Sequence, residues 1–350
     1  MHRALLCLAL IGCYAPTYRE GLVCAQGPDP CPPGQRCFSG TCYLSSRDGA
    51  PDDTDNADAE IDSGACVAGG FCLETTPVTG DLTGVWGSAA DRLWVVGTGG
   101  VWSYNQGTWT KEPPSGSFLA VHGLANNAVW VVASNGGVSF WNGTTWSSTT
   151  AGVAALRAVV GVSINEAWAA GGASRAWHFT NAPPWTQVTT GLSGNAYALA
   201  ASSASEVYLS GDDAAAGTPN GTLFRFQPSA GWTRIGGNPP IPMTFHAMWH
   251  SPNQLFIAGA DNDSGELFRY PVGGAVVTDR TSPARLYAIH GISDGDVWAA
   301  GSEGTVLKRT TSGMWLPVLG AGNVMLRGVA AFPTKVWVVG DNARVFSLSR

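Results

Sequence analysis

Side chains that could bind a ligand recur at fixed places in short segments with the pattern apolar-x-small-apolar-x-small, such as residues 156–161 and 286–291. Arginine can hold a carboxylate through two parallel hydrogen bonds, histidine can transfer a proton, and tyrosine and tryptophan offer aromatic faces. The candidate ligand-binding residues in these segments are His122, Arg157, Tyr197, Trp249, His290 and Arg327.

These segments carry polar or aromatic residues at two positions. One residue after the opening stand Arg157, His246, Tyr287 and Arg327. Three residues further on stand Trp86, His122, Trp249 and His290. Successive side chains of a strand point to opposite sides. The two groups are therefore expected on opposite sides of their strands, so that they cannot all line one pocket.

Catalysis would need more than these residues. A histidine beside an acid can act as a general base, but no serine or cysteine nucleophile has a recognisable spacing, and packed or solvated histidines are more common. The sequence therefore predicts a protein that is not an enzyme. The alternative is a carbohydrate-active enzyme, which would need two carboxylates about 5–9 Å apart across a cleft.

A metal site is the other chemistry to consider. Asp261, Asp263 and Glu266 place oxygen ligands at short intervals around a glycine, a pattern that can wrap a hard cation such as Ca²⁺. The stretch lacks the length of a full EF-hand loop, and a solvated turn is the favoured alternative. No other cofactor is predicted.

From Cys66 onward the sequence repeats a unit of four short strands. The clearest mark of each copy is an aromatic residue followed by a short, mostly apolar run and a turn, as in residues 94–97 and 337–340, and successive marks lie 36–48 residues apart. Four antiparallel strands in about 40 residues are typical of a propeller blade. The seven copies predict an all-β fold, a seven-bladed β-propeller, with some candidate side chains near its central axis.

The two ends of the repeat region are expected to meet. The seventh copy stops at Arg350 after three strands. Phe71 precedes Leu82 by 11 residues, the spacing by which Trp315 precedes Leu326. We therefore expect residues 70–77 to supply the missing strand and to close the ring.

The N-terminus resembles a bacterial export signal. A positive start and a short apolar run lead to Leu10-Ile11-Gly12-Cys13, which resembles a lipobox. This resemblance implies that residues 1–12 are a lipoprotein signal peptide and that Cys13 carries a lipid, the protein's only membrane attachment, at the outer membrane or cell surface. The alternative is a truncated or wrongly started secretory signal, which also implies export.

Six further cysteines crowd into the first fifth of the chain. They are Cys24, Cys31, Cys37, Cys42, Cys66 and Cys72. An even number so placed favours disulfides in an oxidising compartment, and the absence of a C-x-x-C pair and of a nearby histidine disfavours zinc. Residues 13–43 are thus expected to be a small disulfide-rich segment with open pairing, residues 44–65 an acidic disordered linker, and residues 66–350 the propeller.

The charge of the chain limits the classes of binding partner to be expected, and its aromatic content indicates how the repeats pack. The formal net charge is −6, and lysine and arginine form no block, which disfavours nucleic acid as a partner. All 15 tryptophans lie inside the repeats, where most are expected to pack between blades, because buried aromatic side chains contribute strongly to cores.

Residues 70–350 resemble secreted bacterial propeller lipoproteins with V-W-G…D-V-W-A-V-G…G-x-x-W repeats, best at residues 82–109 and 286–315. More distantly they are similar to Asp-box propellers such as sialidases, although the R-I-P start of that family is missing. The resemblance implies fold and location more than activity. The leading function is a protein- or glycan-binding module at the cell envelope, and an envelope assembly factor is a further alternative.

Overall fold

The computed structural model describes residues 66, 69–152, 155–172, 174–180, 182–212, 221–235 and 242–350, and the backbone of residues 35–38 and 41–44. The chain divides into two compact units, Met1–Asp55 and Asn56–Arg350. The expectations for residues 1–12, Cys13, Cys24 and Cys31, and for all but the first residue of the predicted linker 44–65, fall outside the described residues. Within these residues no helix has the length and apolar character needed to cross a membrane.

The first unit contains one described hairpin. Strand β1 (Gln35–Phe38) pairs with β2 (Thr41–Leu44) in antiparallel register, and the backbones of Cys37 and Cys42 lie directly opposite each other.

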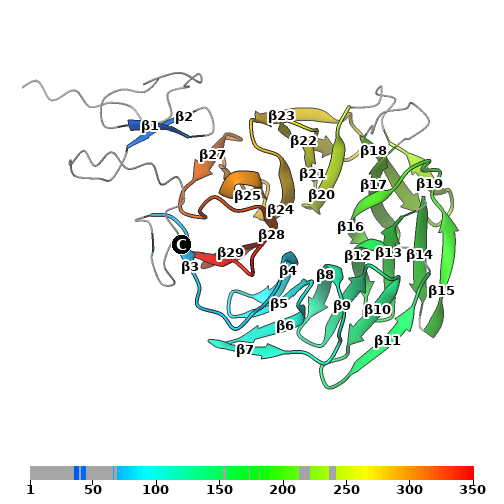
Figure 1. Ribbon diagram of the computed structural model, residues 1–350. Coiled ribbons are helices and arrows are strands. Elements are labelled where there is room, and N and C mark those ends of the chain that lie inside the picture. Colours follow the sequence, from blue (N-terminus) through cyan, green and yellow to red (C-terminus); the bar gives the residue numbers. More distant parts are fainter. Residues whose placement is uncertain are drawn as a thin grey trace, which may run out of the picture. The chain divides into compact units, whose positions relative to one another are not determined.

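The second unit is a ring of seven four-stranded antiparallel sheets, which confirms the predicted seven-bladed β-propeller (Figure 1). The first blade comprises β4 (Leu82–Ala89), β5 (Arg92–Gly97), β6 (Gly100–Asn105) and β7 (Thr108–Lys111). The second comprises β8 (Phe118–Ala125), β9 (Ala128–Ala133), β10 (Gly137–Trp141) and β11 (Trp146–Thr150). The third comprises β12 (Leu156–Ser163), β13 (Glu166–Gly171), β14 (Arg175–Thr180) and β15 (Ala182–Thr189).

The remaining blades follow the same order. The fourth comprises β16 (Ala196–Ser203), β17 (Glu206–Asp212), β18 (Gly221–Gln227) and β19 (Gly231–Arg234). The fifth comprises β20 (Thr244–His250), β21 (Gln254–Ala260), β22 (Gly265–Pro271) and β23 (Val277–Ser282). The sixth comprises β24 (Leu286–Ser293), β25 (Asp296–Gly301), the 3-10 turn η2 (Ser302–Gly304), β26 (Val306–Arg309) and β27 (Trp315–Val318).

The seventh blade is completed by the N-terminal strand. Its strands are β28 (Leu326–Ala331), β29 (Lys335–Gly340), β30 (Val345–Ser349) and β3 (Cys72–Leu73). Cys72 lies opposite Ser347, and the amide of Phe71 donates to the carbonyl of Leu319 at 2.9 Å. A disulfide joins Cys66 to Cys72. The predicted closure by the segment near Phe71 is thus confirmed.

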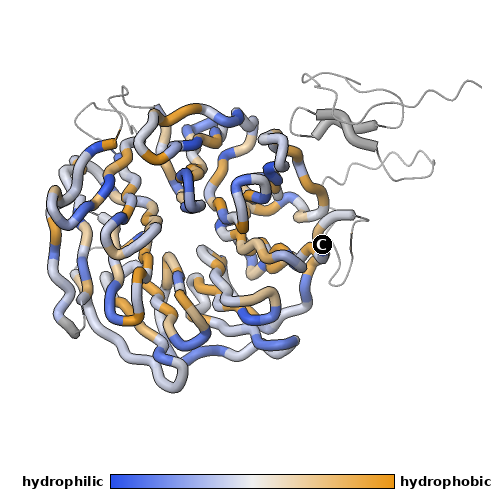
Figure 2. The backbone as a smooth tube through the Cα atoms, turned by 180° about the vertical axis from the view of Figure 1, so that it is seen from behind, coloured by the Kyte–Doolittle hydropathy of each residue, from blue (hydrophilic) through white to orange (hydrophobic). Residues whose placement is uncertain are grey.

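The blades are held together by apolar contacts between neighbouring sheets. Figure 2 shows apolar stretches along the strands and hydrophilic stretches in the connecting turns. Nine of the fifteen tryptophans are buried, and Trp130, Trp168, Trp298 and Trp337 of the second strands are almost completely enclosed. Near the axis, the third residue of a first strand is small and lies against an apolar side chain of the next blade. Gly84, for example, lies against Val121. Small residues at this position therefore let seven strands approach the axis closely.

A candidate ligand-binding site in the axial cavity

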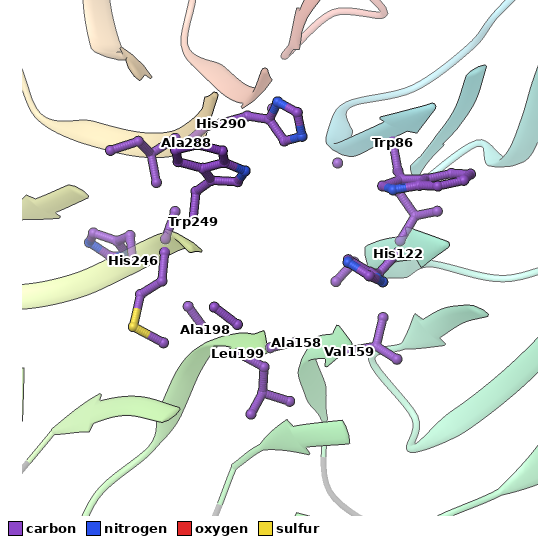
Figure 3. A pocket seen from close by; sticks show the side chains of 18 of the residues that line it. Trp86, His122, Ala158, Val159, Ala198, Leu199, His246, Trp249, Ala288 and His290 are labelled. Carbon is purple, nitrogen blue, oxygen red and sulfur yellow. The ribbon is translucent and has the colours of Figure 1, made fainter. Parts of the chain in front are cut away.

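The first strands of all seven blades surround a cavity of about 370 Å³ (Figure 3). All six candidate ligand-binding residues named from the sequence, His122, Arg157, Tyr197, Trp249, His290 and Arg327, line it. A volume of this size is within the range of small-molecule sites in proteins. The structure therefore brings the whole candidate set to one place.

This arrangement corrects the expectation that two groups of side chains must face opposite ways. Every first strand has a β-bulge near its start, as between Leu156 and Ala158 and between Leu326 and Gly328, at the second residue in six blades and at the third residue, His246, in β20. A bulge inserts an unpaired residue and re-aims its side chain. Arg157 and Arg327 are such residues, and they line the same cavity as His122 and His290. The strict alternation of a regular strand does not hold there.

One end of the cavity carries cationic and aromatic side chains from five consecutive blades. We call it the arginine mouth, and its residues are Arg157, Tyr197, His246, Tyr287 and Arg327. The guanidinium of Arg157 lies 5.5 Å from the ring centre of Tyr197. His246 follows at 5.7 Å from Tyr197 and at 5.0 Å from Tyr287, both edge to face. Arg157, Tyr197, His246 and Tyr287 thus form a continuous series of contacts along the mouth.

The two arginines of the mouth differ in their pairing. Arg327 donates from Nε and Nη2 to the carboxylate of Asp341 at 2.6 and 3.1 Å. The hydrogen bonds to Asp341 raise the pKa of Arg327. Arg157 is exposed to the cavity, and no ion pair involves it in the part of the chain that the structure describes.

The carboxylate of Asp212 interacts electrostatically with Arg157 but is hydrogen-bonded to other groups. Asp212 is hydrogen-bonded to Tyr197 and to the hydroxyl of Thr244, the latter at 3.4 Å. Burial raises the pKa of Asp212 and also that of Tyr197. Arg157 is therefore the guanidinium of the mouth with free hydrogen-bonding capacity.

His246 stands at the centre of the mouth in its neutral form. Burial, and then the nearby charges of Arg157, Arg285 and Arg327, lower the pKa of His246 from 6.5 to about 4. At neutral pH the imidazole is therefore uncharged, and the positive charge of the mouth resides on the arginines.

The other group of first-strand residues lies about 10 Å further along the strands, at three residues' distance. We call it the tryptophan–histidine end, formed by Trp86, His122, Trp249 and His290. Figure 3 shows Trp86 beside His122 and Trp249 beside His290, on different sides of the cavity. The ring centres are 6.3 and 6.1 Å apart in the two pairs.

The candidate cation ligands Asp261, Asp263 and Glu266 lie at the connection between β21 and β22. No group of three or more histidine, cysteine or acidic side chains among the described residues is arranged to hold a metal. The carboxylate of Asp261 instead accepts the amides of Asp263 and Ser264 at 2.8 and 2.6 Å. These hydrogen bonds lower the pKa of Asp261. The carboxylate of Asp261 thus caps its own turn, and a cation bound by Asp261, Asp263 and Glu266 stays a prediction.

Comparison with known proteins adds the fold and little more. No protein-family model and no curated protein matches the sequence. Among solved structures, a catalytically inactive virginiamycin B lyase from Staphylococcus aureus with quinupristin is similar, with a TM-score of 0.68 and 13% identity over 80% of this chain and 99% of that one. The fold is that of a β-propeller. A streptogramin B lyase aligns with a TM-score of 0.68 and 12% identity over 80% of this chain and 98% of that one.

A third similar structure is YCF48 bound to a D1 peptide, with a TM-score of 0.62 and 14% identity over 80% of this chain and 97% of the other. The two lyases correct one expectation. The sequence predicted a protein that is not an enzyme, but enzymes are among the propellers most similar to it. Missing nucleophile motifs in the sequence are therefore no ground for excluding catalysis in this fold.

Proposed function

We propose that this chain is an exported propeller, anchored at the cell envelope through a lipid on Cys13, that binds the carboxylate of a small ligand at the arginine mouth. The observation that carries the binding role is Arg157, exposed on the cavity wall, stacked against Tyr197 and without an ion pair among the described side chains. Arginine binds carboxylates in a planar, two-pronged geometry.

The residues around Arg157 favour the binding of an anion by its guanidinium group. Its ring contact with Tyr197 restricts the guanidinium, so that less side-chain entropy is lost on binding. Arg327, fixed by Asp341, adds a second cation at the same mouth. The hydroxyl of Tyr287 and the neutral ring of His246 lie between them along the mouth and can bind an oxygen-rich group.

Benzoate and benzamide test this role, because they share a shape and differ in charge. We expect full-length protein to bind benzoate at least tenfold more tightly than benzamide by calorimetry. Arg157→Gln should abolish the difference, whereas Lys111→Gln, the same charge change at an exposed residue of the outer strand β7, should preserve it. Equal binding of the two probes by the unaltered protein would refute the carboxylate assignment.

The mouth also favours a second candidate, chemical conversion of the bound ligand. His246 is a neutral imidazole flanked by two tyrosines, a set that can accept and return a proton. The lyases among the similar structures support this candidate. Incubation with quinupristin, followed by mass spectrometry, tests it: consumption by the unaltered protein and not by His246→Gln would support catalysis, and an unchanged compound would count against that substrate.

Export and anchoring have a separate test. Expression in a bacterial host with labelled palmitate should place label on the full chain and recover it in the membrane fraction. Cys13→Ser should carry no label and leave that fraction. Label on the serine variant would contradict lipidation at Cys13.

A further inference from the structure

The tryptophan–histidine end is built twice from the same parts. Trp86 of the first blade stands beside His122 of the second, and the amide of Gly161 in the third donates to Nδ1 of His122 at 3.2 Å. Trp249 of the fifth blade stands beside His290 of the sixth in the same way. The amide of Ala331 in the seventh donates to Nδ1 of His290 at 3.2 Å. Two like units thus face one cavity.

Glycines hold the two indoles in place. A Cβ atom on Gly123 would lie 2.5 Å from the ring of Trp86, and one on Gly291 would lie 2.8 Å from the ring of Trp249. Each indole therefore packs directly on the backbone of the next blade, and any larger residue would displace it. Rings that are fixed in this way form a preorganised surface.

The hydrogen bonds determine the tautomer of both histidines. An Nδ1 atom that accepts an amide hydrogen carries no proton of its own. Burial lowers the pKa of His122 and of His290 to about 4, so both rings are neutral at pH 7. The proton of each ring is therefore on Nε2, which makes Nε2–H a donor at the cavity wall.

The chemistry of the cavity selects what these donors can bind. No aspartate or glutamate is among the described residues that line the cavity, so each Nε2–H lacks a carboxylate there. A carbonyl oxygen can accept a hydrogen bond from such a donor. The adjacent indoles offer flat apolar faces for a planar amide or ester group.

We infer that the tryptophan–histidine end is a second subsite, which takes the neutral carbonyl of an amide or ester on Nε2–H of His122 or of His290, beside the indole of the same unit. This subsite rests on the proposed function in one respect, since it assigns the far end of a ligand whose carboxylate lies at the arginine mouth. The ligand class is then an organic acid with an acyl or amide carbonyl about 10 Å from its carboxylate, the separation of three strand residues.

The test uses N-methylacetamide as a carbonyl probe and benzoate as a mouth probe, with full-length protein labelled with ¹⁵N at histidine. Long-range ¹H–¹⁵N spectra should first show protonated Nε2 and bare Nδ1 in both histidines. N-methylacetamide should then shift both Nε2–H signals in a saturable way. The signal of His178, which is bonded to Glu166 at 2.8 Å on an outer strand, is the internal control and should stay fixed.

Two double variants separate the donors from the ring shape. His122→Phe/His290→Phe keeps both rings but removes both donors, and should weaken N-methylacetamide binding at least tenfold, whereas His122→Gln/His290→Gln restores N–H donors and should stay within threefold of the unaltered protein. Unshifted Nε2–H signals in the unaltered protein, or equal affinity in the phenylalanine variant, would overturn the subsite. Benzoate should still bind to the phenylalanine variant, so that failure of the subsite and failure of the arginine mouth are distinguished, and Arg157→Gln should lose benzoate while retaining N-methylacetamide.

Discussion

The indole N–H of Trp315 donates a hydrogen bond of 2.7 Å to Oδ2 of Asp279, across the boundary between the fifth and sixth blades. The same carboxylate accepts from Nε of Arg309 at 2.9 Å and from Nε of Arg269 at 2.5 Å. A matching bond of 2.8 Å runs from Trp146 to Glu112 between the first and second blades. An acid near the outer edge of one blade thus ties the next blade to it at two places in the ring.

Asp279→Asn should lower the free energy of unfolding by about 3 kcal/mol, because it leaves the buried Arg309 without its counter-charge. The side chains of Asp279 and Arg309 are only 7% and 10% exposed, so solvent screens the pair weakly. Urea unfolding followed by tryptophan fluorescence measures the change. Asp91→Asn, in an exposed turn, should stay within about 0.5 kcal/mol. Equal stability of the two variants would argue against the interblade tie.

The contribution of the Asp279 carboxylate to the free energy of unfolding should also depend on pH in the acidic range. Its hydrogen bonds from Trp315, Arg309 and Arg269 lower the pKa of Asp279, despite opposition from burial. A carboxyl group whose pKa is lower in the folded state stabilises the fold above its unfolded pKa of 3.8, and this contribution is lost as pH falls. The stability gap between the unaltered protein and Asp279→Asn should therefore shrink below pH 3.8. A gap that stayed constant down to pH 2 would contradict the assignment.

Phe71→Ala should open the ring at its closing strand. Phe71 is fully buried and packs edge to face against Trp298 at 6.3 Å. Removing such a ring from a core costs about 4 kcal/mol. Hydrogen exchange should show the loss of protection concentrated in β30 and β3, which pair there. Leu316→Ala, at a 45% exposed position, is the matched control and should leave exchange in β30 unchanged.

The repeat spacing was sufficient to predict the blades and their closure. The apolar residue that opens the pattern in each blade, such as Leu82 or Leu326, is buried where the pattern places it. The cavity was less predictable, because period-two alternation separates Arg157 from His122, and nothing in the sequence marks the bulge that reunites them. His246 and Tyr287 were recognised at the same strand position as the two arginines, but not as ligand-binding candidates. Their contacts with each other and with Tyr197 depend on the curvature of the ring, which spacing alone does not encode.

Gly123→Ala should disturb the tryptophan–histidine end specifically. The added methyl group would meet the ring of Trp86 at 2.5 Å. Overpacking of this kind costs about 2 kcal/mol, and the emission of Trp86 should change as the indole moves. Gly84→Ala, where the nearest atom would lie at 3.4 Å, should cost less. A larger loss at Gly84 would mean that the indole is not fixed by Gly123.

The burial of His122 predicts that the protein loses stability at mildly acidic pH. The pKa of His122 is lowered from 6.5 to about 4 by burial, and to a smaller extent by the charge of His290. The unfolded chain binds a proton that the folded protein does not between these values, so stability should fall as pH decreases from about 6.5 to about 4. Urea midpoints across this range should decline less steeply for His122→Gln, which does not titrate. Parallel slopes for the two proteins would show that His122 is not held neutral by the fold.

The most direct test of the carboxylate site is the structure of the full-length protein with 4-iodobenzoate, located by the anomalous signal of iodine. We predict the carboxylate within hydrogen-bond distance of the guanidinium of Arg157, with the iodine deeper in the cavity toward Trp86 and Trp249. A carboxylate placed on the outer strands, or an iodine at the mouth with the carboxylate pointing away from Arg157, would contradict the account.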